Sequence, residues 1–145
     1  HLDIMKFLLT EATLNLEATD NDGFTFLHLA SYTGHVDVVK YSVLEISANV
    51  EATANFNRTP LHNAAEQGHL AVVRCLCREA GANVLATDRK DQTPFVLASW
   101  SHHKAFNSVE QATEKDGEQM SRVNMLKETK EFLRVWERRA RSGLP

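Results

Sequence analysis

The sequence predicts an all-α solenoid, in which helix-turn-helix repeats stack and a longer C-terminal helix closes the stack. Three observations lead to this fold class. Residue types recur every 34 positions over about residues 1–112, each copy carries the start and stop signals of short helices, and the last part of the chain forms one apolar helical stripe. A unit of this size cannot bury its apolar side alone, so neighbouring copies must stack.

The 34-residue period is carried by several residue types at once. Three threonines, three alanines, four histidines and two glycines keep the same spacing, and one register aligns all of them. Chance is therefore a poor explanation. The matching residues are Thr25, Thr59 and Thr93; Ala30, Ala64 and Ala98; His1, His35, His69 and His103; and Gly34 and Gly68.

The second copy shows how one unit folds locally. Thr59 can cap a helix whose first turn holds Pro60, where a missing N–H costs nothing. Gly68 then supplies the left-handed conformation that ends this helix. A second helix with an apolar stripe is predicted over residues 70–79, and Gly81 ends it. The stretch that follows is extended and rich in turn residues.

These units resemble the ankyrin repeat. The resemblance rests on Thr59-Pro60-Leu61-His62-Asn63-Ala64, on Gly68-His69 and on Ala82-Asn83-Val84, and it covers about residues 1–112. The usual ankyrin period is about 33 residues, so the extra residue falls near the end of the second helix. The resemblance implies L-shaped units, with short β-hairpin fingers in front of paired antiparallel helices. It also implies binding through the fingers and the concave helix face.

The third copy departs from this pattern. Val96 replaces the motif histidine, His102 replaces the glycine and Lys104 replaces an apolar helix residue. Terminal repeats are expected to be atypical because their outer face meets water.

The chain divides into repeats and a C-terminal helix. The first unit begins inside a second helix, so we expect upstream repeats or another subunit to cover its exposed edge. The expected divisions are ankyrin repeats over 1–112 (a partial repeat 1–19, repeats of about 20–53 and 54–87, and a degenerate repeat 88–112), a loop or residual finger over 113–120, and an amphipathic capping helix with its tail over 121–145.

The C-terminal segment lacks proline and glycine from about residue 120 to 141, and its apolar residues follow three-and-four spacing. We expect a helix that folds back as a cap on the last repeat; docking on a partner, or on a membrane or phosphate, is the alternative. Residues 121–145 hold seven basic and three acidic residues, whereas residues 1–120 hold nine and sixteen.

Composition excludes several classes of protein. The chain is 43% hydrophobic and 24% charged with a net charge of −3, so we expect no nucleic-acid partner. No apolar run approaches the roughly 20 residues of a membrane span. Cys75 and Cys77 suit a reducing compartment, so an intracellular location, cytoplasmic or nuclear, is expected. Two positions apart on a helix, they point to nearly opposite sides, which predicts buried thiols in place of a metal pair.

No pattern of catalytic residues, cofactor-binding glycines or metal ligands appears in the sequence. We therefore expect no enzyme activity, no cofactor and no metal. The histidines of the repeated motif, His28 and His62, are expected to bond to the threonine hydroxyl and to the backbone.

The candidate binding site consists of residues that the repeat does not need. Four large aromatic residues occupy positions that usually face outward in ankyrin units, and aromatic and arginine side chains dominate interface energies. The alternative is that these rings pack on neighbouring repeats or on the C-terminal helix. The candidate residues are Asn21, Asp22, Phe24, Tyr32, Asn55, Phe56, Arg58, Glu66, Arg89, Lys90, Gln92 and Trp100.

The expected function is protein–protein interaction, as an adaptor, scaffold or assembly subunit with a protein partner. One alternative is a regulatory or targeting module of a larger enzyme or channel whose other domains lie upstream. Another is a structural peripheral subunit with one permanent interface.

Overall fold

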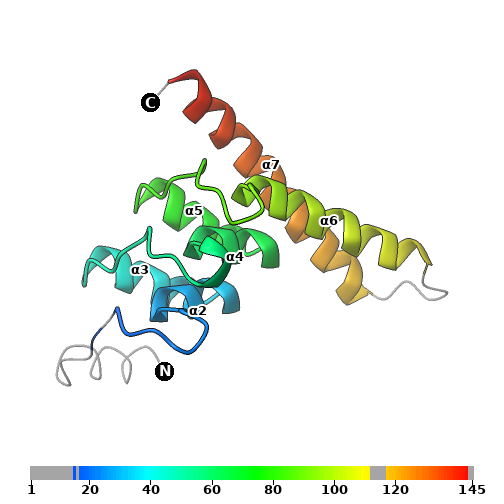
Figure 1. Ribbon diagram of the computed structural model, residues 1–145. Coiled ribbons are helices and arrows are strands. Elements are labelled where there is room, and N and C mark those ends of the chain that lie inside the picture. The colour runs from blue at the N-terminus through cyan, green and yellow to red at the C-terminus, as the bar shows by residue number, and fades with distance from the viewer. Residues whose placement is uncertain (1–14, 16, 112–116, 144–145) are drawn as a thin grey trace.

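The computed structural model describes residue 15, residues 17–111 and residues 117–143. Its helices stack as antiparallel pairs, with the loops gathered on one side (Figure 1). No strand occurs in these residues, so the all-α class is confirmed, while the expected β-hairpin fingers are turns. The helices are α2 (Phe26–Thr33), α3 (Val36–Leu44), the 3-10 helix η1 (Asn55–Asn57), α4 (Pro60–Gln67), α5 (Leu70–Arg78), α6 (Pro94–Gln111) and α7 (Gly117–Ser142).

Two expected segments lie mainly outside the described residues. These are the partial repeat over 1–19 and the part of the loop or finger over 113–116. Residues 117–120, which were expected to belong to that loop, instead form the first turn of α7. Glu118 lies in this first turn, where the positive end of the helix dipole stabilises a carboxylate.

The first helix of each complete repeat begins at a threonine and ends at a left-handed glycine. Thr59 Oγ1 lies 2.9 Å from Nδ1 of His62, and the Thr59 N–H donates to the same nitrogen at 3.2 Å. Gly68, with φ of +79°, ends α4 at the predicted position. The same pairing of Thr25 with His28 opens α2.

The two motif histidines also join neighbouring repeats. Nε2 of His28 donates to the carbonyl oxygen of Arg58 at 3.0 Å, and Nε2 of His62 donates to that of Gln92 at 3.1 Å. Because Nδ1 accepts a backbone N–H in both rings, each ring is neutral. Burial lowers the pKa of both imidazoles, since it penalises the charged form. The predicted structural role of these residues is confirmed.

The second helix of the repeat ends slightly earlier than predicted. Helix α5 stops at Arg78, and Gly81, with φ of +67°, then reverses the chain. The N–H of Ala82 thereby donates to the carbonyl of Leu76 at 2.9 Å. One repeat earlier, Ser47 takes the same left-handed conformation, with φ of +52°, although it has a side chain.

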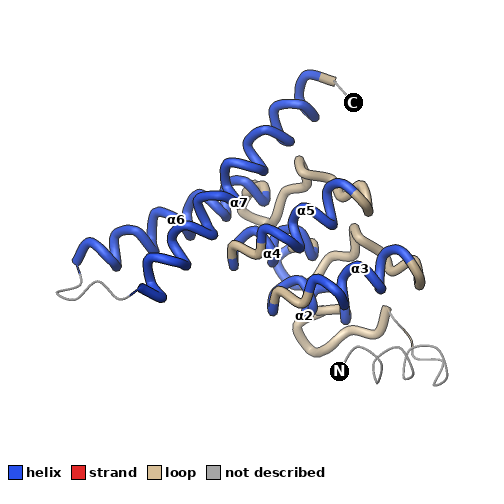
Figure 2. Tube along the Cα trace, turned by 180° about the vertical axis from the view of Figure 1, so that it is seen from behind, coloured by secondary structure: helices blue, strands red, loops and turns tan. Residues whose placement is uncertain are grey.

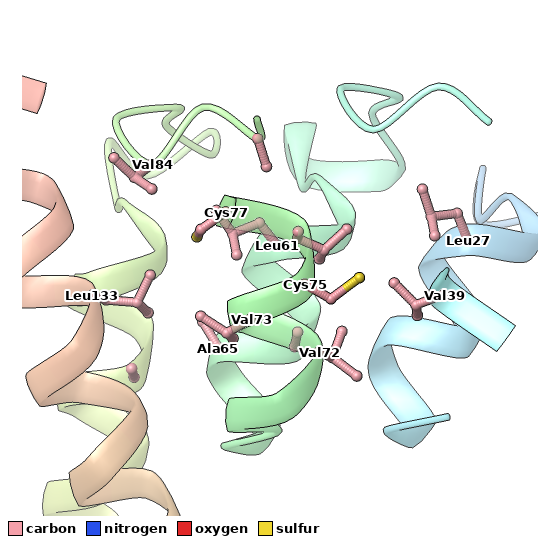
Figure 3. Packing of buried hydrophobic residues seen from close by; sticks show 14 of the residues in the cluster. Leu27, Val39, Leu61, Ala65, Val72, Val73, Cys75, Cys77, Val84 and Leu133 are labelled. Carbon is pink, nitrogen blue, oxygen red and sulfur yellow. The ribbon is translucent and has the colours of Figure 1, made fainter. Parts of the chain in front are cut away.

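The core lies between the stacked helix pairs and contains both cysteines. Figure 3 shows the sulfur of Cys75 directed toward Val39 of α3, whereas the sulfur of Cys77 points away from it. The two side chains are buried, and burial raises the pKa of Cys75 to about 11 and that of Cys77 to about 12. They are core thiols, as predicted.

The third repeat does not have two short helices. Residues 94–111 form the single helix α6, whose 18 residues span about 27 Å. The helix continues through the position where glycines end α2 and α4, because His102 stands there and, unlike glycine, has a side chain that disfavours the left-handed conformation. The C-terminal half of α6 and the first turns of α7 project beyond the stacked repeats (Figures 1 and 2).

Helix α7 takes the place of the missing second helix and closes the stack. It packs against α4, α5 and α6. The hydroxyl of Thr129 donates to the carbonyl of Gly68 at 3.0 Å. Leu126 covers the same glycine so closely that an added Cβ would lie 2.8 Å from its Cδ2. One repeat earlier, the ring of His69 covers Gly34 in the same way.

Candidate partner-binding surface

The turns between the helix pairs form three fingers, and the middle one differs from the others. Asp20 and Asp88 each accept two backbone N–H groups at 2.8–3.0 Å and so hold the first and third fingers. Ala54 stands at the equivalent position of the middle finger and offers no carboxylate. There Phe56 adopts the left-handed conformation, with φ of +62°. This conformation costs a residue with a side chain about 1–2 kcal/mol.

Backbone hydrogen bonds join the three fingers in a row. The N–H of Asn55 donates to the carbonyl of Asp22 at 2.9 Å, and the N–H of Arg89 donates to the carbonyl of Phe56 at 2.8 Å. Each finger is thereby fixed relative to the next. The candidate residues of the fingers therefore form one row across the repeats.

Arg58 links this row to the ends of the first helices. Its Nη1 lies 2.7 Å from Oε2 of Glu66 near the end of α4, and its Nε lies 3.8 Å from Oδ2 of the buried Asp88. The finger row and the helix ends consequently belong to one side of the molecule. We call this side, which carries the fingers, the ends of α2 and α4 and the part of α6 around Trp100, the inner face.

Three of the four candidate aromatic residues are available on the inner face. The exposed fractions are 48% for Tyr32, 59% for Phe56 and 55% for Trp100. Phe24 differs, because it is half-buried and its ring packs edge-on against His28 with the centroids 5.7 Å apart. The ring of Phe24 therefore packs within its own repeat, and not on a neighbouring repeat or on the C-terminal helix as the alternative to an exposed site had it.

The remaining candidates fall into two groups. The exposed ones lie in the finger row, and the half-buried ones take part in bonds within a repeat or between neighbouring repeats. The exposed group is Asn21, Asp22, Asn55, Arg89 and Lys90, and the half-buried group is Arg58, Glu66 and Gln92.

A pocket of about 570 Å³ lies where the inner face meets α7. Glu66, Trp100, Lys104 and Arg122 are among the residues that line it. Only the first two were candidates from the sequence. Lys104 carried a signal, since it replaces an apolar residue of the repeat pattern. Arg122 carried none, because its place depends on how α7 folds back.

Two features are absent from the part of the chain that the structure describes. It contains no group of three or more histidine, cysteine or acidic residues that could hold a metal ion. None of its helices is both long and apolar enough to cross a membrane.

Family comparisons agree with the repeated geometry. A model described as ankyrin repeats (many copies) matches residues 1–41, and one described as ankyrin repeats (3 copies) matches residues 42–110. Only such repeats are found, and they are in general protein–protein interaction modules without catalytic activity. No curated protein matches the chain. The repeated motifs, the paired helices and these two matches together show that the chain belongs to the ankyrin-repeat family.

Proposed function

We propose that this chain is a protein–protein interaction module that binds a protein partner through the finger row and the inner face. The observation that carries the proposal is the exposure of Tyr32, Phe56 and Trp100 on one side of three successive repeats. Large aromatic side chains dominate interface energies when a partner removes them from water. The proposed contact residues are these three with the exposed polar residues of the finger row.

Phe56 has a second feature that supports a binding role. It is largely exposed and is held in a conformation that its side chain disfavours. Exposure means that the ring contributes little to the core, so stability alone gives no reason for phenylalanine at this position. Strained residues of this kind concentrate at functional sites.

The inner face is suited to rigid display of its side chains. Hydrogen bonds between the fingers and the ion pair of Arg58 with Asp88 of the next repeat hold neighbouring repeats in register. A preorganised surface loses little conformational entropy on binding. This favours a role as an adaptor, a scaffold or a subunit of an assembly.

The proposal can be tested by capturing partners from an extract of the source organism and measuring each partner's affinity by calorimetry. Tyr32→Ala, Phe56→Ala and Trp100→Ala should each weaken binding about tenfold or more, as expected for interface hot spots. Leu44→Ala is the matched control, since Leu44 is 52% exposed but lies on α3, away from the finger row. Unchanged affinity in all three variants would contradict the proposal.

A further inference from the structure

We propose that the pocket between α4, α6 and α7 binds an acidic linear peptide segment of the protein partner. A carboxylate of the segment lies between Lys104 and Arg122, and a neighbouring apolar side chain packs against Trp100. This inference rests on the proposed interaction function and specifies the chemistry of the partner. It concerns a site that the ankyrin pattern does not contain, because α7 supplies one of its walls.

The free charge of the pocket is positive. Lys104 comes from α6 and Arg122 from α7, and neither forms an ion pair with any residue that the structure describes. The acidic residue of the pocket, Glu66, is already bonded to Arg58 at 2.7 Å. A ligand that entered would therefore meet two cations that form no ion pair with a carboxylate among the described residues.

The positive charge of Arg122 acts on the imidazole of His69. Burial is the main cause that lowers the pKa of His69, and the charge of Arg122 lowers it further. His69 in turn donates from Nε2 to the carbonyl of Tyr32 at 2.9 Å.

The walls of the pocket suit an apolar side chain beside the carboxylate. Trp100 is 55% exposed, and Nζ of Lys104 lies 5.3 Å from the centroid of its ring. Ala105 and the buried Val109 provide further apolar surface. The volume of about 570 Å³ falls within the roughly 300–1,000 Å³ of typical ligand sites.

A segment of a longer partner fits this place better than an isolated small molecule. Glu66 and Trp100 belong both to the pocket and to the inner face, so a chain that crosses the pocket continues along the proposed binding surface. The charge of the protein also favours this end. Residues 1–120 hold sixteen acidic and nine basic residues, whereas this pocket presents the two cations Lys104 and Arg122 to an acidic segment.

The test is a selection of random twelve-residue peptides displayed against the intact 145-residue chain. Enriched peptides should carry aspartate or glutamate next to an aromatic or aliphatic residue. Their affinities are then measured by fluorescence anisotropy at low and high salt. The double variant Lys104→Gln with Arg122→Gln should weaken binding by about five- to tenfold at low salt and less at high salt.

The matched control removes the same charge elsewhere on α7. Arg138 and Arg139 lie on the exposed last turns of the helix. The double variant Arg138→Gln with Arg139→Gln should change the peptide affinity less than about twofold, as expected for charges outside an interface. Trp100→Ala should also weaken the enriched peptides. Circular dichroism checks that each variant keeps its helix content.

Several outcomes would overturn the proposal that this pocket binds an acidic segment. They are the enrichment of basic or uncharged peptides, the absence of any binder, and acidic peptides that bind the Lys104 and Arg122 double variant normally. Peptides that lose affinity only in Phe56→Ala would also overturn it, while leaving the interaction function intact. Peptides that respond to no inner-face variant would argue against both proposals.

Discussion

Replacing Gly68 with alanine should loosen the contact between α7 and the repeats. Gly68 has φ of +79°, where alanine costs about 1–2 kcal/mol in backbone strain. Its added Cβ would also lie 2.8 Å from Cδ2 of Leu126 and 3.2 Å from the Leu126 backbone nitrogen. Rotation of the leucine side chain relieves only the first contact, so the α7 backbone must shift.

The size of the effect follows from what that shift disturbs. Leu126 is 1% exposed, and full burial of a leucine contributes about 1.5–3 kcal/mol. The bond from Thr129 to the Gly68 carbonyl contributes about 1 kcal/mol more. Losing part of both, in addition to the strain, gives an expected destabilisation of about 3–4 kcal/mol for Gly68→Ala.

The chain offers a matched control for the strain alone. Gly81 has φ of +67°, but nothing lies within 4 Å of an added Cβ. Gly81→Ala should therefore cost only about 1–2 kcal/mol. The difference between the two variants, about 2 kcal/mol, measures the contact with α7.

Urea unfolding followed by circular dichroism gives both free energies. A Trp100→Phe background leaves Trp136 of α7 as the single tryptophan, so its fluorescence reports on α7. Gly68→Ala should shift this fluorescence under native conditions, whereas Gly81→Ala should not. Equal costs for the two variants would refute the reasoning, since α7 would then gain nothing measurable from Gly68.

Three further predictions concern the finger, the motif histidines and a helix end. Phe56→Asn should leave the free energy of unfolding within about 1 kcal/mol of the wild type, because asparagine tolerates the left-handed conformation and so offsets the lost burial; thermal unfolding checks this, and calorimetry should show at least a tenfold weaker partner affinity. Acidification should destabilise the fold, since burial lowers the pKa of His28 and His62. Their contribution is complete above an unfolded-state pKa of about 6.5 and is lost as the pH falls from there toward the folded pKa, by up to about 1.4 kcal/mol per pH unit for each ring. Urea unfolding between pH 7.5 and 5.5 measures this slope, and His62→Gln should flatten it; an unchanged slope would contradict the assignment. Ser47→Gly should raise the urea midpoint, with a gain of roughly 0.5–1 kcal/mol, because Ser47 has φ of +52°; a lower midpoint would show that the serine is not strained.

The sequence by itself determined the features that depend on neighbours along the chain. In the two complete repeats, the threonine that opens the first helix, the glycine that ends it and the histidine that bonds to the threonine all lie within ten residues of one another. The two cysteines were predicted as core thiols for the same reason, because helix periodicity alone places them on different buried sides. Repetition strengthened each of these inferences, since one register accounted for every copy.

Only the tertiary structure decided the features that join distant segments. The third repeat kept a single long first helix, and α7 supplied its partner from residues that follow the repeats. The same folding back of α7 brings Arg122 to the pocket beside Lys104 and Trp100. Local propensity cannot settle such contacts, because their energy comes from surfaces that meet only after the chain has folded.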